Sequence, residues 1–191
     1  MKIRVLILPF LLILVSISLQ AQEGIDYNHK ILIKTLEKHG GPNKITISEI
    51  DMPDSMTTHN QINGKYFSLI GDSSHLFRYL YVGRVVSCKA GGCSVIGTNT
   101  NNENPEFFDY FMLFDADLVV QEVRVFNYQA THGQEITARG WLKQFKGYNA
   151  NETWMVNKNI DAISGATISV NAITLDIIEK THLLQQVTAD L

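Results

Sequence analysis

Residues 107–128 constrain the fold most, because they read as two adjacent β-strands. Aromatic and aliphatic residues dominate 107–114 and 118–128, a composition typical of strands. Between them, Asp115-Ala116-Asp117 suits a tight hairpin connection. Alternate side chains of an extended chain point to opposite faces. We therefore expect one face to carry Val119, Gln121, Val123 and Val125, and the other to carry Val120, Glu122, Arg124 and Phe126.

The aromatic residues of this segment are better explained by packing than by ligand stacking. Phe107, Phe108, Phe111 and Phe114 recur in a strand-like run, and strands favour aromatic side chains for packing alone. We expect them in the sheet and the core.

Other segments predict further strands and helices around this hairpin. Strands are expected over residues 44–50, 65–70 and 76–86, the first of them half-buried because polar and apolar residues alternate. Polar, turn-rich residues 51–63 and 98–105 predict loops.

Two longer helices are also predicted. A helix over 26–39 stops at Gly40-Gly41-Pro42, and 141–146 is a short helical or irregular piece that Gly147 ends. A helix over 167–186 follows from apolar residues at helical spacing, namely Ile168, Ala172, Leu175 and Ile178, widened by Ile173, Ile177 and Leu184. The fold class is α+β, an antiparallel sheet packed with helices.

The N-terminus resembles an export signal. Lys2 and Arg4 precede an apolar stretch, and Ala21 offers a small residue at a cleavage position. Residues 1–21 therefore predict a signal peptide. The alternative is a retained anchor, but the apolar stretch contains Pro9 and is short for a span of about 20 residues. We expect an exported protein, periplasmic or at the outer face of the cytoplasmic membrane.

The charge balance argues against one class of partner. Sixteen Lys and Arg stand against nineteen Asp and Glu, a net charge of −3. Because no basic surplus exists to hold a phosphate backbone, we expect no binding to nucleic acid.

The chemistry is concentrated immediately before the last helix. Ser164-Gly165-Ala166-Thr167 sets two hydroxyls around two very small residues, so the Thr167 hydroxyl is easily presented to another molecule. A helix start also offers unpaired N–H groups and a partial positive charge, which suit a phosphate. The alternative is an ordinary helix cap, since Ser and Thr are common at helix starts.

Asp161-x-x-Ser164-Gly165-Ala166-Thr167 resembles the flavinylation signature of the FMN-binding domain family. That family includes the periplasmic flavin subunits of the Rnf complex and of the sodium-translocating NADH:quinone oxidoreductase. There, a flavin transferase moves the FMN part of FAD onto the final Thr hydroxyl and leaves a phosphoester. The resemblance makes Thr167 the covalent attachment residue. Ser164, Gly165 and Ala166 become the setting that the transferase recognises, and Asp161 matches the family's acidic residue.

Upstream residues extend the resemblance to about residues 75–187. Gly133-Gln134-Glu135 and residues 141–147 are similar to the stretch that precedes the family's attachment motif. The chain departs from the family at 131–135, where the family often has a Glu-Thr-Pro-Gly-like turn. His132 lies in this turn, either as a solvated loop histidine or near the flavin. The expected organisation is a leader over 1–21, an N-terminal helix and strand region over 22–74, and an FMN-binding domain over 75–187.

The resemblance implies an exported electron-transfer flavoprotein that carries covalent FMN on Thr167, more an electron carrier or redox subunit than a stand-alone enzyme. Its expected partners are a flavin transferase during maturation and membrane or periplasmic redox proteins. One alternative is a small exported binding module without flavin, in which the motif only caps a helix. Another is a flavin-dependent reductase in which Cys88 and Cys93 relay electrons.

Cys88 and Cys93 are the only cysteines and are spaced C-x₄-C. An exported chain meets an oxidising environment, so a structural disulfide is the first expectation. A redox-active dithiol beside the flavin and a metal site are the alternatives.

Overall fold

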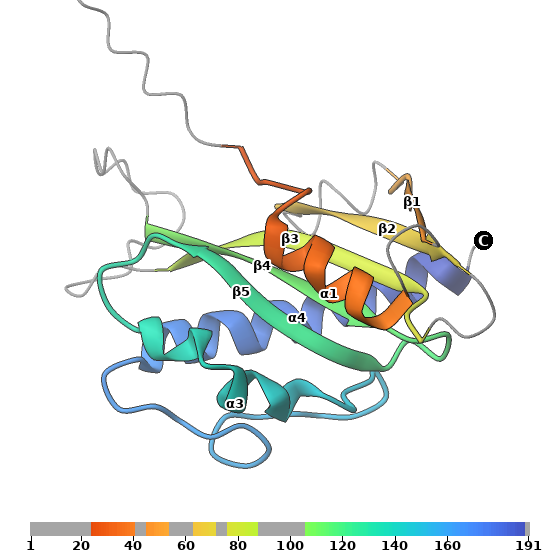
Figure 1. Ribbon diagram of the computed structural model, residues 1–191. Helices are drawn as coiled ribbons and strands as arrows, with labels where there is room; N and C mark the ends of the chain where they lie inside the picture. The colour runs from red at the N-terminus through yellow and green to blue at the C-terminus, as the bar shows by residue number, and fades with distance from the viewer. Residues whose placement is uncertain (1–23, 41–44, 54–62, 72–75, 88–105, 190–191) are drawn as a thin grey trace, which may run out of the picture.

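The computed structural model describes residues 24–40, 45–53, 63–71, 76–87 and 106–189 (Figure 1). The predicted signal peptide, the Cys88–Cys93 disulfide and the predicted loop 98–105 lie outside the described residues. In the described part, no helix is long and apolar enough to cross a membrane.

The core element is a five-stranded antiparallel sheet in which each strand pairs with the next along the chain. The order of strands in the sheet therefore follows the sequence. The long hairpin predicted over 107–128 is confirmed. The strands are β1 Thr46–Glu49, β2 Gly64–Ile70, β3 Tyr79–Ser87, β4 Glu106–Phe114 and β5 Val120–Tyr128.

Helices cover both faces of the sheet (Figure 1). Helix α1 (Lys30–Gly40) lies on one face and the long helix α4 (Thr167–Ala189) crosses the other. Successive residues of β4 divide between the two cores: Tyr110 and Met112 pack with α4, whereas Phe111 and Leu113 pack with α1. The α+β class is confirmed, with an antiparallel sheet between helices and a C-terminal helix.

A short helical stretch links β5 to the site described below. It comprises the 3₁₀-helix η1 (Gln134–Thr137), helix α3 (Arg139–Leu142) and the 3₁₀-helix η2 (Lys143–Phe145). Ile136, Trp141, Leu142 and Phe145 bury their side chains in the same core as α4. This agrees with the short helical piece predicted over 141–146.

A β-bulge corrects the faces predicted for β5. Leu113 pairs with Glu122 and Phe114 with Val120, so Gln121 is an extra residue in the strand. Such a residue reverses the alternation of side chains beyond it. Val120 is therefore buried in the same core as Val123 and Val125, and its predicted place beside Phe126 is wrong.

Strand β1 is more exposed than its alternating sequence predicts. All four of its residues are exposed, and Ile47 retains 39% of its surface. The half-buried character predicted for 44–50 is found only at Ile45 and Ile50, which flank the strand and pack against the two cores. The strand lies at the edge of the sheet and pairs only through β2.

A group of buried polar side chains joins the sheet to α4. Asp176 accepts a hydrogen bond from the Tyr110 hydroxyl at 2.5 Å and lies 3.5 Å from Lys180 Nζ. The Tyr66 hydroxyl donates to the Lys180 carbonyl at 2.9 Å. Burial raises the pKa of Asp176 above its ordinary value of 3.8, and the charges of Lys180 and the Tyr110 bond oppose that rise.

Replacing Tyr110 by phenylalanine is expected to lower the free energy of unfolding by about 1–3 kcal/mol at neutral pH, because a buried carboxylate loses its donor. Because the pKa of Asp176 is higher in the folded than in the unfolded chain, protonation of this carboxyl stabilises the fold. That contribution is complete below pH 3.8, the ordinary pKa, and is lost as the pH rises through the raised pKa. Without the Tyr110 bond that pKa rises further. Urea unfolding should therefore show a smaller loss at acidic pH than at neutral pH.

Tyr148 offers the matched control. Its hydroxyl is buried and has no hydrogen-bond partner among the described residues. Tyr148→Phe should leave the free energy of unfolding unchanged or slightly higher. An equal loss in both variants would contradict the role given to the Tyr110 bond.

Candidate functional site

The segment that carries the sequence motif ends where α4 begins. Thr167 is the first residue of the helix, which places Ala166 at the N-cap position, and the Ala166 carbonyl accepts from the Val170 N–H at 2.9 Å. Gly165 has a φ of 82°, and the Ala166 N–H donates to the Ile163 carbonyl at 3.1 Å. This turn buries Ala166, which is 2% exposed, while Ser164, Gly165 and Thr167 stay exposed.

The two hydroxyls of the motif do not cap the helix. Within the described residues, neither the Ser164 nor the Thr167 hydroxyl makes a hydrogen bond. The N-cap residue is an alanine, which has no side-chain acceptor. The first N–H groups of α4, at Thr167, Ile168 and Ser169, have no acceptor within the helix. The helix start therefore presents unpaired donors together with a free hydroxyl.

Residues 154–163 are held against the short helical stretch through the main chain of Asp161. The Trp141 indole N–H donates to the Asp161 carbonyl at 2.9 Å, and the Asp161 N–H donates to Gln144 Oε1 at 2.8 Å. The carboxylate of Asp161 is exposed and takes no part. Trp141 and Gln144 belong to the upstream stretch that resembles the family, so the structure connects that stretch physically to the motif.

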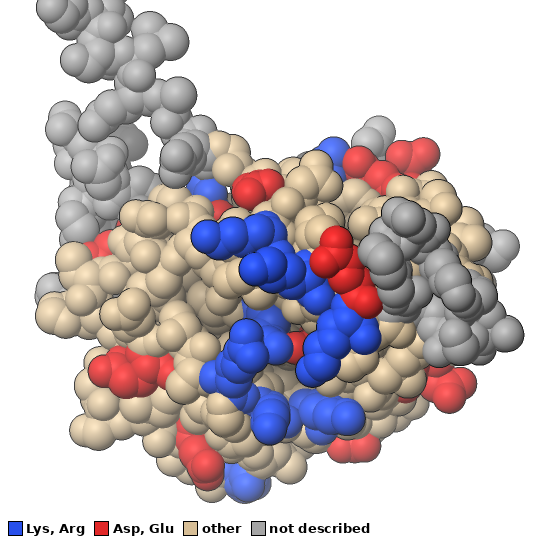
Figure 2. Space-filling model, in the orientation of Figure 1, with Lys and Arg blue, Asp and Glu red and all other residues tan. Residues whose placement is uncertain are grey.

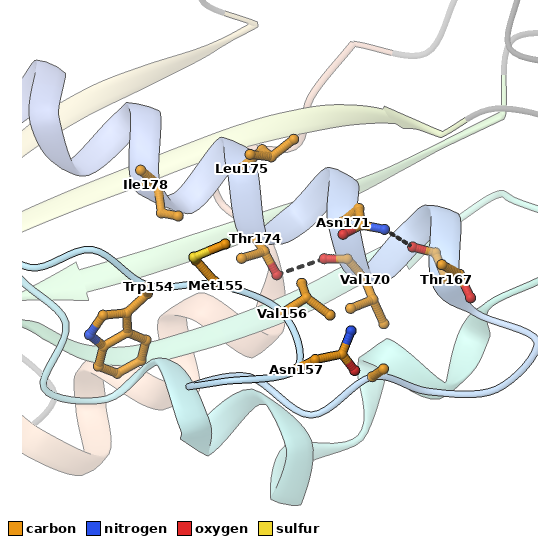
Figure 3. Close-up of a pocket in the computed structure, with 11 residues that line it drawn as sticks. Trp154, Met155, Val156, Asn157, Thr167, Val170, Asn171, Thr174, Leu175 and Ile178 are labelled. Atoms are coloured by element: carbon orange, nitrogen blue, oxygen red, sulfur yellow. Dashed lines mark hydrogen bonds between the residues drawn. The ribbon is translucent and has the colours of Figure 1, made fainter.

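A cavity of about 360 Å³ runs from Thr167 along α4 (Figure 3). The helix forms one wall and residues 154–157 form the other, with Thr167 at one end of the row and Trp154 at the other. The lining is mainly apolar, and Leu175 is 66% exposed within it. The lining residues are Trp154, Met155, Val156, Asn157, Ala162, Thr167, Val170, Asn171, Thr174, Leu175 and Ile178.

A second cavity of about 230 Å³ is also lined by Thr167. Ser87, His132, Gly165, Ala166, Thr167, Ile168 and Ser169 line it. It is smaller and more polar in character than the first, and no Lys or Arg of the described residues lines either cavity.

A chain of hydroxyls connects the second cavity to the turn after β5. The Tyr128 hydroxyl donates to the His132 carbonyl at 2.6 Å and lies 3.1 Å from Ser169 Oγ, which lies 3.4 Å from Ser87 Oγ. Because the only Tyr128 hydroxyl proton is used by His132, Ser169 is the donor to Tyr128. Burial raises the pKa of Tyr128, and the Ser169 bond opposes that rise.

The structure brings only some of the predicted site residues together. Gly165, Ala166 and Thr167 line the smaller cavity with His132, whereas Ser164 and Asp161 line neither cavity. Sequence reasoning missed the larger cavity. Asn171 and Leu175 follow Thr167 at four and eight residues, which places them on one helix face, and that spacing was a usable signal.

Trp154 is the harder residue to find from sequence. It lies in the irregular segment 154–163, which is fastened at Asp161, and no local pattern indicates that it lines the larger cavity. Among the described residues, no group of three or more His, Cys, Asp or Glu could hold a metal ion.

The chain was compared with known proteins in three ways. Residues 92–177 match the family model of the FMN-binding domain, a range that includes Thr167 and the first half of α4. No curated protein and no solved structure matches the chain. The FMN-binding domain is thus the family that residues 92–177 match, as the motif that ends at Thr167 predicts.

Proposed function

We propose that this chain is an exported electron-transfer flavoprotein whose FMN is joined to Thr167 by a phosphoester. The observation that supports this most is the exposed Thr167 hydroxyl, which is free of hydrogen bonds among the described residues and lies where two cavities meet. The domain match supports flavin binding. A bound flavin supplies one- or two-electron transfer, while the protein orients it and sets its potential.

The start of α4 fits the phosphate of such a group. The N–H groups of Thr167, Ile168 and Ser169 lack helical acceptors, and the helix start favours negative charge. With no Lys or Arg lining either cavity, these donors would carry the phosphate. The larger, apolar cavity suits the ring system, and its volume of about 360 Å³ is within the usual range of ligand pockets.

Attachment requires a second protein. The Thr167 Oγ1–phosphorus bond would form as the pyrophosphate bond of FAD breaks, with AMP as the leaving group and loss of the hydroxyl proton. The partners we propose are a flavin transferase during maturation and periplasmic or membrane redox proteins afterwards. Ser164 and Asp161 line neither cavity but are exposed, which leaves both accessible to a transferase.

Intact-mass measurement tests this proposal. The chain should be co-expressed with a flavin transferase, recovered from the exported fraction and denatured before analysis. We expect a mass increase equal to FMN less one water, and no increase when the transferase is omitted. Flavin absorbance that separates from the denatured chain would retain flavin binding but overturn the covalent bond.

Absence of flavin in both native and denatured protein would contradict the whole proposal. The expression of an unmodified, folded chain can be verified by its circular dichroism. A flavin-free folded protein would favour the alternative of a binding module.

Leu175→Gln is expected to change the fluorescence yield and the reduction potential of the attached flavin without reducing its amount. The side chain is 66% exposed and lines the larger cavity, so a polar amide changes the ring's surroundings more than the fold. Ile168→Gln is the control, because Ile168 is 42% exposed and lines the smaller cavity. Spectroelectrochemistry gives the reduction potential of the flavin in both variants and in the wild type. A shift in the Ile168 variant alone would place the ring in the smaller cavity.

Gly165→Val is expected to block flavin attachment while costing less stability than a core truncation of about 2–5 kcal/mol. A branched side chain beside Thr167 obstructs entry into another enzyme's active site. At a φ of 82° it also strains the backbone by about 1–3 kcal/mol. Fluorescence of the denatured protein in a gel reports attachment.

Gly147→Val is the control that separates the effect of backbone strain from the effect of a bulky side chain beside Thr167. The φ of Gly147 is 96°, and a Cβ there would meet nothing within 4 Å, as at Gly165, but it lines neither cavity. Gly147→Val should lose similar stability and still carry flavin. Normal attachment in the Gly165 variant would show that the transferase does not depend on this turn.

A further inference from the structure

A third cavity, of about 600 Å³, lies away from Thr167 and is surrounded by cations. Five of the chain's sixteen Lys and Arg residues line it, although the chain as a whole carries a net charge of −3. Figure 2 shows basic side chains on several sides of a hollow below α1, with an acidic one inside it. The five are Lys38 of α1, Arg124 of β5, Arg139 of α3, Lys143 of η2 and Lys146 immediately after it.

Only one acidic side chain lines this basic cavity. Glu122 accepts from Arg124 Nε at 2.6 Å and lies 3.8 Å from His39 Nε2. The other four cations make no ion pair with any described residue. Within the described residues, a carboxylate therefore neutralises only one of the five cations.

Local helix electrostatics explain only part of this arrangement. Lys38 and His39 lie in the last turn of α1, where positive charge offsets the helix dipole. Arg139 and Lys143 lie in helices of only four and three residues, whose dipoles are small, and Lys146 lies outside any helix. Like charges that converge from separate elements repel one another, and an anion bound between them would remove that repulsion.

We propose that the basic cavity binds a ligand that carries phosphate groups, with a total charge of at least −2. Its volume is in the range of small-molecule sites, and its cations come from four elements, which suits more than one anionic group. Arginine presents a planar set of donors that matches phosphate oxygens. Glu122 holds Arg124 through Nε, which leaves the two terminal nitrogens of that guanidinium free of bonds to the described residues.

This site is separate from the proposed flavin site. The basic cavity shares no lining residue with either cavity at Thr167. Its occupation does not require attached flavin, so the inference stands or falls independently of the proposed function.

Calorimetric titration of the full chain with sodium pyrophosphate at low ionic strength tests the proposal. We expect binding that weakens as salt is added, since the attraction is electrostatic. Arg139→Gln with Lys143→Gln should weaken it at least about tenfold, because two charge-assisted contacts are lost. Both side chains are exposed, so the fold should be unaffected.

Lys30→Gln with Lys158→Gln is the matched control. It also removes two positive charges, but from exposed positions that line none of the three cavities. Pyrophosphate affinity should therefore stay at the wild-type value. Equal weakening in both double variants would mean a general charge effect and would overturn the site.

A second arm distinguishes the source of the phosphate. Sedimentation with phosphatidylcholine vesicles that contain cardiolipin tests a lipid headgroup that carries two phosphates. Vesicle binding lost in the Arg139/Lys143 variant but kept in the control, without pyrophosphate binding, would assign the cavity to a membrane lipid. If wild-type protein binds neither probe, or if the Arg139/Lys143 variant binds as well as wild type, the proposal is overturned.

Discussion

Replacement of Thr167 by valine is expected to abolish covalent flavin completely. Valine has nearly the shape of threonine but no hydroxyl, so no oxygen remains to form the phosphoester. The side chain is exposed and makes no hydrogen bond to a described residue, so the stability should change by less than about 0.5 kcal/mol. Ultraviolet-excited fluorescence of denatured protein in a gel should appear for wild type and be absent for this variant.

Two further substitutions control that experiment. Thr167→Ser keeps an oxygen at the same position and should retain measurable labelling. Ser164→Ala removes the motif's other hydroxyl, which lines neither cavity, and should leave attached flavin on Thr167. Fluorescence that persists in Thr167→Val but disappears in Ser164→Ala would move the attachment to Ser164.

Arg84→Met is expected to lower the free energy of unfolding by about 3–5 kcal/mol, the largest stability loss that we predict. Arg84 and Asp109 face each other across β3 and β4, with Nε–Oδ1 at 2.6 Å and a second bond from Nη2 to Oδ2 at 3.0 Å. Their side chains are 7% and 0% exposed. Methionine leaves the Asp109 carboxylate buried without its countercharge, with only the Asn127 amide at 2.7 Å still donating to it among the described residues.

Chemical denaturation of two further variants tests whether the unpaired Asp109 charge causes the loss of stability. Arg78→Met removes an arginine immediately before β3 that makes no ion pair with the described residues, and it should cost less than about 0.5 kcal/mol. Arg84→Met with Asp109→Leu removes both charges and should recover much of the loss. A double variant no more stable than Arg84→Met would show that the pair's packing, rather than the unpaired charge, dominates.

Much of the fold could be predicted because its signals are local. The hairpin of β4 and β5 follows from two apolar runs around Asp115-Ala116-Asp117, and α4 follows from apolar residues at helical spacing. Helix α1 begins four residues after its predicted start. His29, the residue just before the helix, caps it, because the His29 ring accepts a hydrogen bond from the Ile31 N–H. Local capping of this kind sets a boundary that periodicity cannot locate.

The features that sequence could not supply depend on contacts between distant residues. The bulge at Gln121 inverts the face of Val120 and is held by a bond from the Gln121 amide to Asp115 at 2.6 Å. The apolar spacing of α4 predicts a helix but not which face is buried. Ile168 and Leu175 of that spacing are exposed, whereas Ile173 and Ile177 are in the core. Only the sheet packed beneath α4 decides between these faces.

The candidate site shows the same division. Thr167 stands out from the residue types around it, because two small residues and a helix start can be read directly. The opposite wall of the larger cavity cannot be read in this way, since Trp154 lies thirteen positions from Thr167 and outside any helix or strand. Its ring packs against Tyr148 with ring centroids 5.2 Å apart and its indole N–H donates to Glu152 at 2.7 Å, while Trp141 and Gln144 hold the loop that follows it.

The main chain and the side chain of Asp161 have separate surroundings: the main chain is hydrogen-bonded and the side chain is exposed. Its peptide carbonyl and amide hold the loop, and every amino acid except proline offers both groups. These two hydrogen bonds therefore do not depend on which side chain, proline excepted, stands at position 161. The carboxylate is exposed and makes no hydrogen bond to a described residue, so Asp161→Asn should leave both of these main-chain bonds in place.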